Sequence, residues 1–479
     1  MSVLSLLLGK KQQQPLVVSK MPVQVDGVVL AGEQLQVYER FLEEHRQGKK
    51  ILWSVLGLSG TGKTTLLKAI QNAPRSEHGG PNCLSTAYVA TAAVQIEAKT
   101  INSTFLLSRD GEPYNANQIA CDRMYQELRA CDVLLIDNVN YVDANTFVNI
   151  NRRLQEAHRN QEAFGGISVI LFGDLFQQSR YGESIYGANA ESQVLWQMFK
   201  SIELTHNFKY ESEEERHVMN AIAMGGLYLE AKEYLTRHCR MDGGNPQKVA
   251  TKLLELRAEY GDQGEKFAVI APSNEMVGDI QERLIAQAIH KQTFPRVNQV
   301  PDITGREDQF SHQSEKTDIA VTVARGCTVM LTINLPISIG NTKILHGTTG
   351  VVEGWDADTI HVRFDDHEDT EKITRVGWYY KKEGTNIREG WEQFPLLVTN
   401  GVYNYQNSQG LLFDGVIVVR ETSWGSGARA LDAGDFYSAL SRAKSLKKSC
   451  ITPTIPLKWT RSGAANQEMA RLRNAQNQE

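Results

Sequence analysis

One short stretch, Gly57–Thr64, constrains the fold of this chain more than any other. It matches the phosphate-binding pattern Gly-x-x-x-x-Gly-Lys-Thr at every fixed position. The apolar run Ile51–Leu56 precedes it as a buried strand, and a helix pattern starts at Thr65. In this context, glycines let backbone N–H groups and the helix N-terminus face phosphate oxygens. The sequence therefore predicts a nucleoside triphosphate site whose residues are Gly57, Gly60, Gly62, Lys63, Thr64 and Thr65.

Two side chains of this loop have distinct expected tasks. Lys63 is expected to reach the β- and γ-phosphates, and Thr64 to place its hydroxyl on Mg²⁺. The alternative, a Gly-rich turn with a chance Lys-Thr pair, is disfavoured by the flanking strand and helix patterns. ATP and Mg²⁺ are the expected cofactors.

Composition limits the class of protein. A chain of 479 residues is too long for one ordinary core, so about three domains are expected. The hydrophobic content of 41% and the charged content of 22% are typical of a folded globular protein. The net charge of −5 argues against a strongly basic nucleic-acid coat protein, although a local basic groove stays open.

The spacing of the cysteines and the length of the apolar runs bear on the cellular compartment. Six cysteines are scattered without a Cys-x-x-Cys pair, so neither a metal site nor a disulfide framework is predicted. We expect a reducing, intracellular setting, cytoplasm or nucleus, with a viral or phage origin left open. No apolar run approaches the length of a membrane span, so no membrane association is expected.

Both ends of the chain differ in composition from its body. Residues 1–27 are expected to form an N-terminal peptide and linker, in which the apolar run Val3–Leu8 is short for a signal peptide. This run is either a docking peptide for a protein partner or an element that packs on the body. Residues 458–479 are polar and rich in Gln and Asn, which predicts a solvated helix or a disordered end.

Residues 28–200 alternate strand-like and helix-like segments. Such alternation predicts a parallel sheet with helices on both faces, and ligands bind at the carboxyl ends of its strands. The expected strands are Leu52–Leu56, Thr86–Ala90, Val133–Ile136 and Ser168–Phe172, and the expected helices are Glu33–His45, Thr64–Gln71, Ile119–Ala130 and Thr146–Gln161.

Residues 201–457 are expected to form a second α/β unit. Residues 241–247 are interpreted as a polar bend and 291–318 as a long loop. From about 320 to 393, short alternating segments with Gly and Asp turns predict a small antiparallel barrel or sheet inserted in this unit. The other expected elements are helices at Glu213–Gly225, Leu227–His238 and Glu275–His290 and a strand at Phe267–Ile270.

Three further residues carry chemistry that suits a nucleotide. Asp137 ends an apolar strand about 70 residues after the phosphate loop, where a carboxylate holds Mg²⁺ in nucleotide hydrolases. Gln177, after the next strand, could hydrogen-bond the γ-phosphate or the attacking water; a plain Gly-Asp turn is the alternative. Arg442 lies in a helix pattern far downstream and is either an arginine finger or a surface residue.

Together with further blocks, these residues resemble the Pif/Dda/RecD-type branch of the superfamily 1 helicases, over about residues 30–446. The blocks occur in the family's order and spacing, which makes the resemblance more specific than any one motif. The similar segments are Leu30–Gln34, Val89–Ala93, Lys99–Phe105, Asp137–Asn145, Leu204–Lys209, Pro395–Gly410 and Phe436–Ala443.

The resemblance implies two RecA-like motor domains with parallel sheets, and ATP in the cleft between them. The residues from Gly347 to about Arg388 would form the family's small barrel in the second domain. Gln34 would read adenine, and Gly410 would contribute to the nucleotide site. Single-stranded DNA, favoured over RNA, would cross the top and be followed 5′ to 3′, contacted by Thr91, Asn102 and Thr399.

The sequence departs from the family's pattern at charged catalytic positions. Asn138 stands where the family has a glutamate that takes a proton from the attacking water, a contribution of roughly 10²–10⁴-fold in rate. Lys209 replaces an arginine and loses its planar fork. Gln406–Asn407 and Gln178–Ser179 replace a His-Lys and a Leu-Pro pair. Asp143 is a poor substitute for the base, because it lies about six residues further along.

These departures leave three functions open. The first is an ATP-dependent helicase or translocase with slow hydrolysis, acting as a monomer or within a complex. The second is a helicase-like ATP-binding subunit with vestigial turnover, used in nucleic-acid binding or assembly. The third is an RNA helicase of the viral type, which Gly415–Arg420 also suits.

Overall fold

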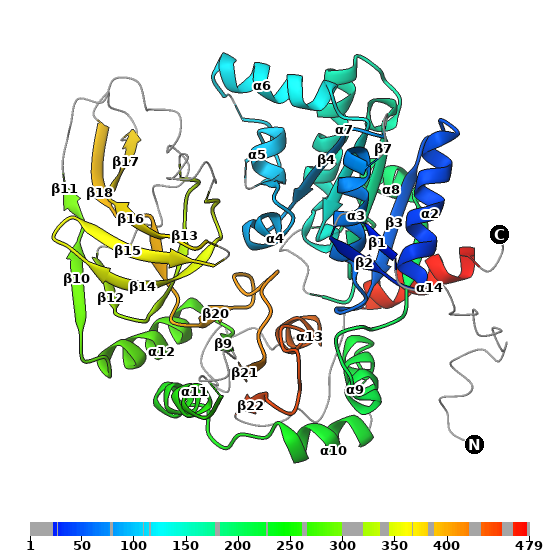
Figure 1. Ribbon diagram of the computed structural model, residues 1–479. Helices are drawn as coiled ribbons and strands as arrows, with labels where there is room; N and C mark the ends of the chain where they lie inside the picture. Colours follow the sequence, from blue (N-terminus) through cyan, green and yellow to red (C-terminus); the bar gives the residue numbers. More distant parts are fainter. Residues whose placement is uncertain are drawn as a thin grey trace.

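The computed structural model describes residues 23–25, 27–76, 80–108, 110–114, 116–177, 183–226, 229–260, 266–298, 320–335, 344–365, 367–381, 388–420, 433–452 and 463–476. The apolar run Val3–Leu8 and the pair Gln178–Ser179 lie outside these residues. Three bodies are visible: two α/β domains, one above the other, and a β-rich part to one side (Figure 1).

The first domain is built on a parallel sheet of six strands in the order β5-β4-β6-β7-β3-β8. A short antiparallel hairpin, β1 (Val23–Val25) and β2 (Val28–Leu30), precedes it. The sheet strands are β3 (Leu52–Gly57), β4 (Cys83–Ala87), β5 (Lys99–Thr100), β6 (Val133–Asp137), β7 (Ser168–Gly173) and β8 (Lys200–Leu204).

Helices cover both faces of this sheet, because successive side chains of a buried strand point to opposite faces. Leu135 and Phe172 pack in one apolar cluster, and their neighbours Ile136 and Leu171 pack in another. The helices are α2 (Glu33–Arg46), α3 (Lys63–Ser76), α4 (Ala90–Gln95), α5 (Ile101–Phe105), α6 (Gln118–Arg129), the 3₁₀ turns η1 (Val139–Tyr141) and η2 (Ala163–Gly166), α7 (Ala144–His158) and α8 (Ala190–Gln197).

The second domain has a smaller parallel sheet in the order β20-β9-β21-β22. Its strands are β9 (Phe267–Ala271), β20 (Val402–Asn404), β21 (Gly415–Val419) and β22 (Cys450–Thr452). Its helices are α9 (Glu213–Ala223), α10 (Leu229–His238), α11 (Pro246–Tyr260), α12 (Asn274–Ala286) and α13 (Ala433–Leu440). Two parallel sheets confirm the predicted fold class.

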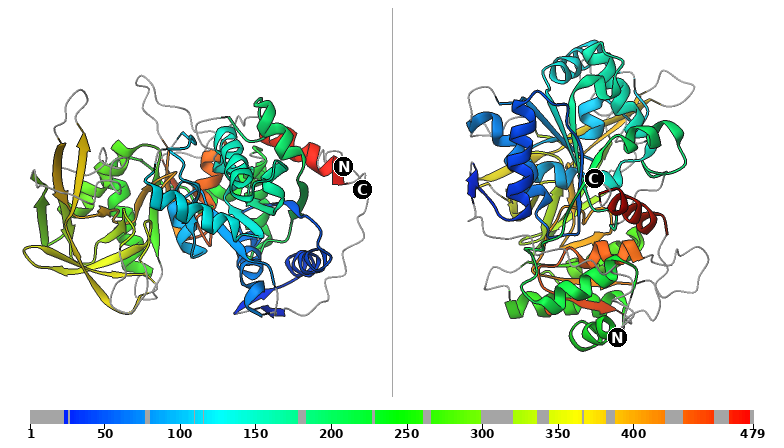
Figure 2. Two further views of the ribbon diagram at one scale, coloured as in Figure 1. Left: turned by 90° about the horizontal axis from the view of Figure 1, so that it is seen from above. Right: turned by 90° about the vertical axis from the view of Figure 1, so that its right-hand side faces the viewer.

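The β-rich part is inserted between β9 and β20 and projects away from the first domain (Figure 2, left). A five-stranded antiparallel sheet, β16-β15-β14-β13-β19, encloses its own apolar core. The strands are β10 (Lys291–Pro295), β11 (Val297–Asn298), β12 (Ala320–Ala324), β13 (Thr328–Leu331), β14 (Thr349–Trp355), β15 (Thr359–Phe364), β16 (Thr370–Thr374), β17 (Val376–Lys381), β18 (Arg388–Gln393) and β19 (Leu396–Val398).

Several elements differ from the sequence-based expectation. Part of the expected loop 291–318 forms β10, which pairs with β12. The expected strand Thr86–Ala90 is shifted, because α4 already begins at Ala90. Helix α11 begins at Pro246, inside the expected bend, since proline suits the first turn of a helix.

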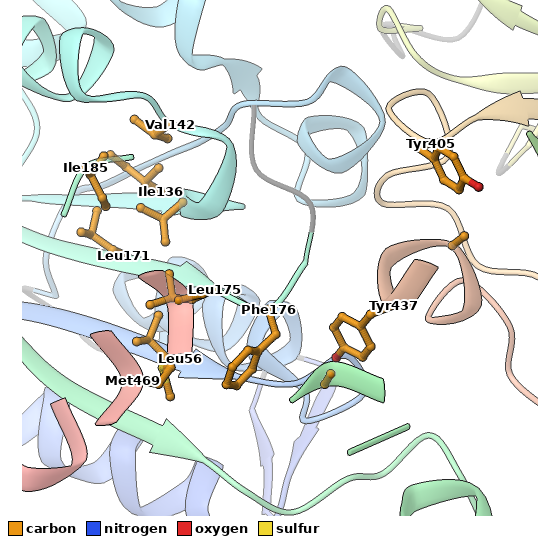
Figure 3. Packing of buried hydrophobic residues seen from close by; sticks show 14 of the residues in the cluster. Leu56, Ile136, Val142, Leu171, Leu175, Phe176, Ile185, Tyr405, Tyr437 and Met469 are labelled. Carbon is orange, nitrogen blue, oxygen red and sulfur yellow. The ribbon is translucent and has the colours of Figure 1, made fainter. Parts of the chain in front are cut away.

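The C-terminal segment is the largest difference. Helix α14 (Gly463–Gln476) buries Ala465, Met469 and Leu472 instead of lying in solvent. It returns to the first domain, where Met469 packs near Leu56 (Figure 3). Among the described residues, helices long and apolar enough to cross a membrane are absent.

Candidate nucleotide site

A cavity of about 740 Å³ lies where the two domains meet. The first domain lines it with the phosphate loop and the carboxyl ends of β6 and β7, as expected for a parallel sheet. The second domain contributes residues before β21 and after α13. The predicted residues in its wall are Gly60, Gly62, Lys63, Thr64, Thr65, Asp137, Asn138, Gln177, Lys209, Gly410 and Arg442.

The phosphate loop needs its glycines because neighbouring side chains pack closely against its backbone. Gly60 has φ +92°, and a Cβ there would lie 2.6 Å from Cβ of Lys209. Gly62 has φ +76° and packs against the Gln34 side chain. Gln34 is buried, and its Nε2 donates to the carbonyl oxygens of Thr61 and Gly62, each at 3.2 Å. Gln34 therefore supports the loop, while adenine reading by it stays a prediction.

Lys63 turns back onto its own loop. Its Nζ donates to the carbonyl oxygens of Gly57 at 2.8 Å and Leu58 at 3.0 Å. Burial lowers the pKa of this ammonium, and the carboxylates of Asp174 and Asp137 oppose that shift. A polyphosphate would supply stronger acceptors than these carbonyls.

Thr64 and Asp137 lie together as a Mg²⁺ site requires. The Thr64 hydroxyl donates to Oδ2 of Asp137 at 3.3 Å, which brings both oxygens beside the phosphate loop. Burial raises the pKa of Asp137, while the Asn138 N–H, Lys63 and Thr64 oppose that rise. A hydroxyl and a carboxylate are oxygen ligands that suit Mg²⁺ held mainly by substrate phosphates.

Asn138 follows in a left-handed conformation, with φ 57° and ψ 44°. Its backbone N–H donates to Oδ1 of Asp137 at 2.8 Å, so its side chain is set at the cavity wall. Within the described part of the chain, Oδ1 of Asn138 is buried without a hydrogen-bond donor. An unpaired buried acceptor at this place fits a bound water that belongs to the site.

Gln177 and Arg442 meet across the domain boundary. Arg442 Nη2 donates to Oε1 of Gln177 at 3.2 Å, and Gln177 Nε2 donates to Oδ2 of Asp174, also at 3.2 Å. Burial lowers the pKa of Arg442. The structure thus brings together two residues that are 265 positions apart in the sequence.

Lys209 is buried between the phosphate loop and α13. Its Nζ donates to the Ser441 carbonyl oxygen and lies 3.5 Å from Oγ of Ser59. Burial, Arg442 and Lys63 together hold the pKa of Lys209 well below its ordinary value. Three cationic side chains therefore converge on one cavity, which favours a polyanionic ligand.

Unlike the nucleotide-site residues, the three predicted DNA contacts do not line the nucleotide cavity. Thr91 donates to the carbonyl oxygen of Gln409, and a Cβ on Gly410 would lie 2.9 Å from the Ala92 nitrogen, so this region is a domain contact. Asn102 caps its own loop by donating to Leu107 and Ser108 carbonyls.

The remaining DNA candidate, Thr399, is buried and hydrogen-bonded to Thr328. A DNA contact by Thr399 therefore stays a prediction. The alternative base Asp143 caps α7 by accepting from Thr146 N, which occupies its carboxylate away from the cavity wall.

Sequence reasoning missed residues that join the motifs. Tyr437 lies in the similar segment Phe436–Ala443, and Asp174 lies in the Gly-Asp turn before Gln177, but their mutual contact has no sequence signal. Glu215 is also buried and accepts from the backbone N–H groups of Leu446 and Lys447. Only the acidic start of α9 could have pointed to it.

Comparison with known proteins agrees with this geometry. Residues 29–223 match the family model described as PIF1-like helicase. The ATP-dependent DNA helicase PIF1 of Mus musculus is 25% identical over 446 residues, which cover 90% of this chain and 61% of that protein. The human PIF1 helicase is likewise 25% identical, with 90% and 62% covered.

Solved structures show the same fold. The Pif1 helicase from Candida albicans superimposes with a TM-score of 0.71 at 17% identity, covering 94% of this chain and all of that one. Bacteroides Pif1 bound to ssDNA gives a TM-score of 0.68 at 20% identity, covering 93% and 97%. The chain spans about 61% of the length of the first curated relative. Residues 29–223 therefore resemble PIF1-like helicases in sequence, and the whole chain shares its fold with solved Pif1 helicases.

Proposed function

We propose that this chain is an ATP-dependent translocase and helicase on single-stranded DNA. In this proposal, it hydrolyses ATP more slowly than it binds it. One observation carries the proposal: Lys63, Asp137, Gln177 and Arg442 line a single cavity although they come from both domains. A site divided between two bodies can convert nucleotide binding and release into relative motion of those bodies.

Slow ATP hydrolysis is proposed because Asn138 stands at the place of the catalytic base. Bound Mg²⁺, held through Thr64 and Asp137, would neutralise phosphate charge. Lys63 and Arg442 would stabilise the charge that develops on the γ-phosphate. The Asn138 amide can orient a water by hydrogen bonding, but it has no free base to take a proton. Binding and alignment are therefore retained while proton removal is weakened.

DNA as the substrate, and 5′-to-3′ movement, are proposed from the family. The curated relatives are named ATP-dependent DNA helicases, and the Bacteroides relative was solved with ssDNA. Thr91 and Gly410 lie where the two domains touch, so a strand held near this contact would sense cleft closure. A reducing, intracellular setting stays a proposal, which the six free cysteine thiols support. A protein partner at the N-terminus also stays a proposal.

The proposal is tested by ATP turnover with and without a single-stranded DNA, using Lys63→Ala as the control that should abolish it. Strand displacement on duplexes with a 5′ or a 3′ tail then tests direction, and equal-length DNA and RNA competitors test the polymer. We expect DNA stimulation and displacement from the 5′ tail only. Absence of any stimulation, also in Asn138→Glu, would instead favour an ATP-binding subunit without motor activity.

A further inference from the structure

We infer that Tyr437 is a positioning residue that aligns Gln177 and Arg442 only when the two domains are closed. This inference rests on the proposed function, since it concerns the same nucleotide site. Tyr437 lies on α13 of the second domain, and its side chain reaches into the first domain beside Phe176 (Figure 3).

The Tyr437 hydroxyl makes two hydrogen bonds, both across the domain boundary. It donates to Oδ2 of Asp174 at 2.8 Å and accepts from the backbone N–H of Ser59 at 2.9 Å. A phenol has one proton to donate and lone pairs to accept, so this pairing uses both capacities. Tyr437 therefore joins the phosphate loop to the turn after β7.

Asp174 links Tyr437 to Gln177 by hydrogen bonds. Its Oδ1 accepts from the Phe176 N–H at 3.0 Å, while its Oδ2 accepts from Gln177 Nε2. The opposite end of the Gln177 amide accepts from Arg442. With one amide end fixed by Asp174, only the oxygen is left to face Arg442, which sets the orientation of both groups.

The chain of contacts begins and ends on the same segment. Tyr437 is on α13 and Arg442 follows two residues after its end. Separation of the domains breaks the Tyr437 and Arg442 contacts together, so alignment of the finger is coupled to closure. The ring is fully buried, and burial together with the Asp174 carboxylate raises the pKa of Tyr437, which keeps the hydroxyl protonated as a donor.

The test compares the affinities of ADP and of ADP with aluminium fluoride, each with Mg²⁺, because a transition-state mimic needs the aligned finger and ADP does not. Neither measurement requires turnover or DNA, so its failure is separate from failure of the helicase activity. Tyr437→Phe keeps the ring and removes only the hydroxyl. Tyr405→Phe is the matched control, since Tyr405 is also buried but donates to Val419 within the second domain.

We expect wild type and Tyr405→Phe to bind the mimic more tightly than ADP. Tyr437→Phe should lose about tenfold or more of that preference, the scale of one hydrogen bond to a charged group. Its ADP affinity should stay within about twofold of wild type, which also shows that it folds. In an Asp174→Asn background, Tyr437→Phe should cause no further loss.

Four results would overturn the inference, three of them in variants. They are an unchanged preference in Tyr437→Phe, an equal loss in Tyr405→Phe, and independent losses when Tyr437→Phe is combined with Asp174→Asn. A wild type that gains nothing from aluminium fluoride would also overturn it, whatever the outcome of the turnover assay.

Discussion

Asn138 and Lys209 show how two substitutions at one site act in different ways. In the proposed mechanism, Asn138 can still orient a water but cannot act as a base. Lys209 keeps the positive charge, but its three donors replace a planar fork that could bind phosphate in two places. We therefore expect the first change to affect the hydrolysis step, and the second to affect nucleotide binding and its pH dependence.

We expect Lys209 to make nucleotide affinity fall as pH rises. Without nucleotide, its pKa is held well below 10.5, so it loses its proton at a lower pH than an exposed lysine does. A bound triphosphate favours the charged form, so binding takes up a proton above that pKa. Each further pH unit then costs up to about tenfold in affinity.

Lys209→Arg should flatten this alkaline fall, because a guanidinium stays charged. Lys63 is present in both proteins, so its own titration cancels in the comparison. The check is the affinity for a fluorescent, non-hydrolysed ATP analogue measured across alkaline pH. Parallel pH profiles would show that Lys209 does not carry the effect, even if Arg lowers affinity at every pH.

The residues recovered from sequence are those whose task is set by local pattern. The phosphate loop, Asp137 and Gln177 each follow a strand, and parallel strands bring their carboxyl ends together. Tyr437 and Glu215 could not be found in this way, because their partners come from segments distant in sequence. The burial of Thr399 could not be predicted for a similar reason, because its contact with the insertion is not visible in its own segment; its role as a DNA contact stays a prediction.

At the scale of elements, buried strands were the most predictable parts of the fold. β6 and β7 are buried along their whole length and carry continuous apolar runs, so little else competes with the strand state. Helix α14 was missed as a packed element because its polar residues hide a narrow stripe, Ala465, Met469 and Leu472. The start of α11 is not predicted, because Pro246 falls within the expected polar bend although it opens the helix.

Helix α14 stabilises the first domain through charged contacts as well as apolar ones. The Trp196 Nε1–H donates to Oε1 of Glu468 at 2.7 Å in a buried setting, and Arg473 pairs with Glu203 through both nitrogens at 2.8 and 2.6 Å. These contacts link the far C-terminal end of the chain to α8 and β8.

Glu468→Ala should leave the Trp196 N–H buried without its acceptor, at a cost of roughly 1–3 kcal/mol. That corresponds to a fall of several degrees in the melting temperature of a domain of this size, about 2–4 °C per kcal/mol. Gln467→Ala on the exposed face of the same helix is the control. Equal melting temperatures for both variants would mean that α14 is not a stabilising element.

Closure of the nucleotide cavity depends on how closely the two domains can approach each other. At Gly410, with φ +78°, a Cβ would lie 2.9 Å from the Ala92 nitrogen and 3.2 Å from the Thr91 carbonyl carbon. Because backbone atoms cannot move aside as a side-chain tip can, any larger residue must separate the two domains locally.

Gly410→Ala should therefore weaken binding of an ATP analogue and lower turnover by at least about tenfold, since a misplacement of about 1 Å can cost 10²-fold. Gly278→Ala is the control, because a Cβ there meets no atom within 4 Å. Small-angle scattering with and without nucleotide checks the cause. A Gly410→Ala protein that closes and turns over like the control would exclude this contact as the limit on closure.

In the proposed mechanism, this site binds and aligns ATP but hydrolyses it slowly, because Asn138 supplies no base. Single-turnover hydrolysis with saturating single-stranded DNA measures that step directly, in wild type and in Asn138→Glu. We expect Asn138→Glu to speed hydrolysis by roughly 10²–10⁴-fold with ATP affinity little changed. Fast hydrolysis by the wild type, with no gain in Asn138→Glu, would contradict it.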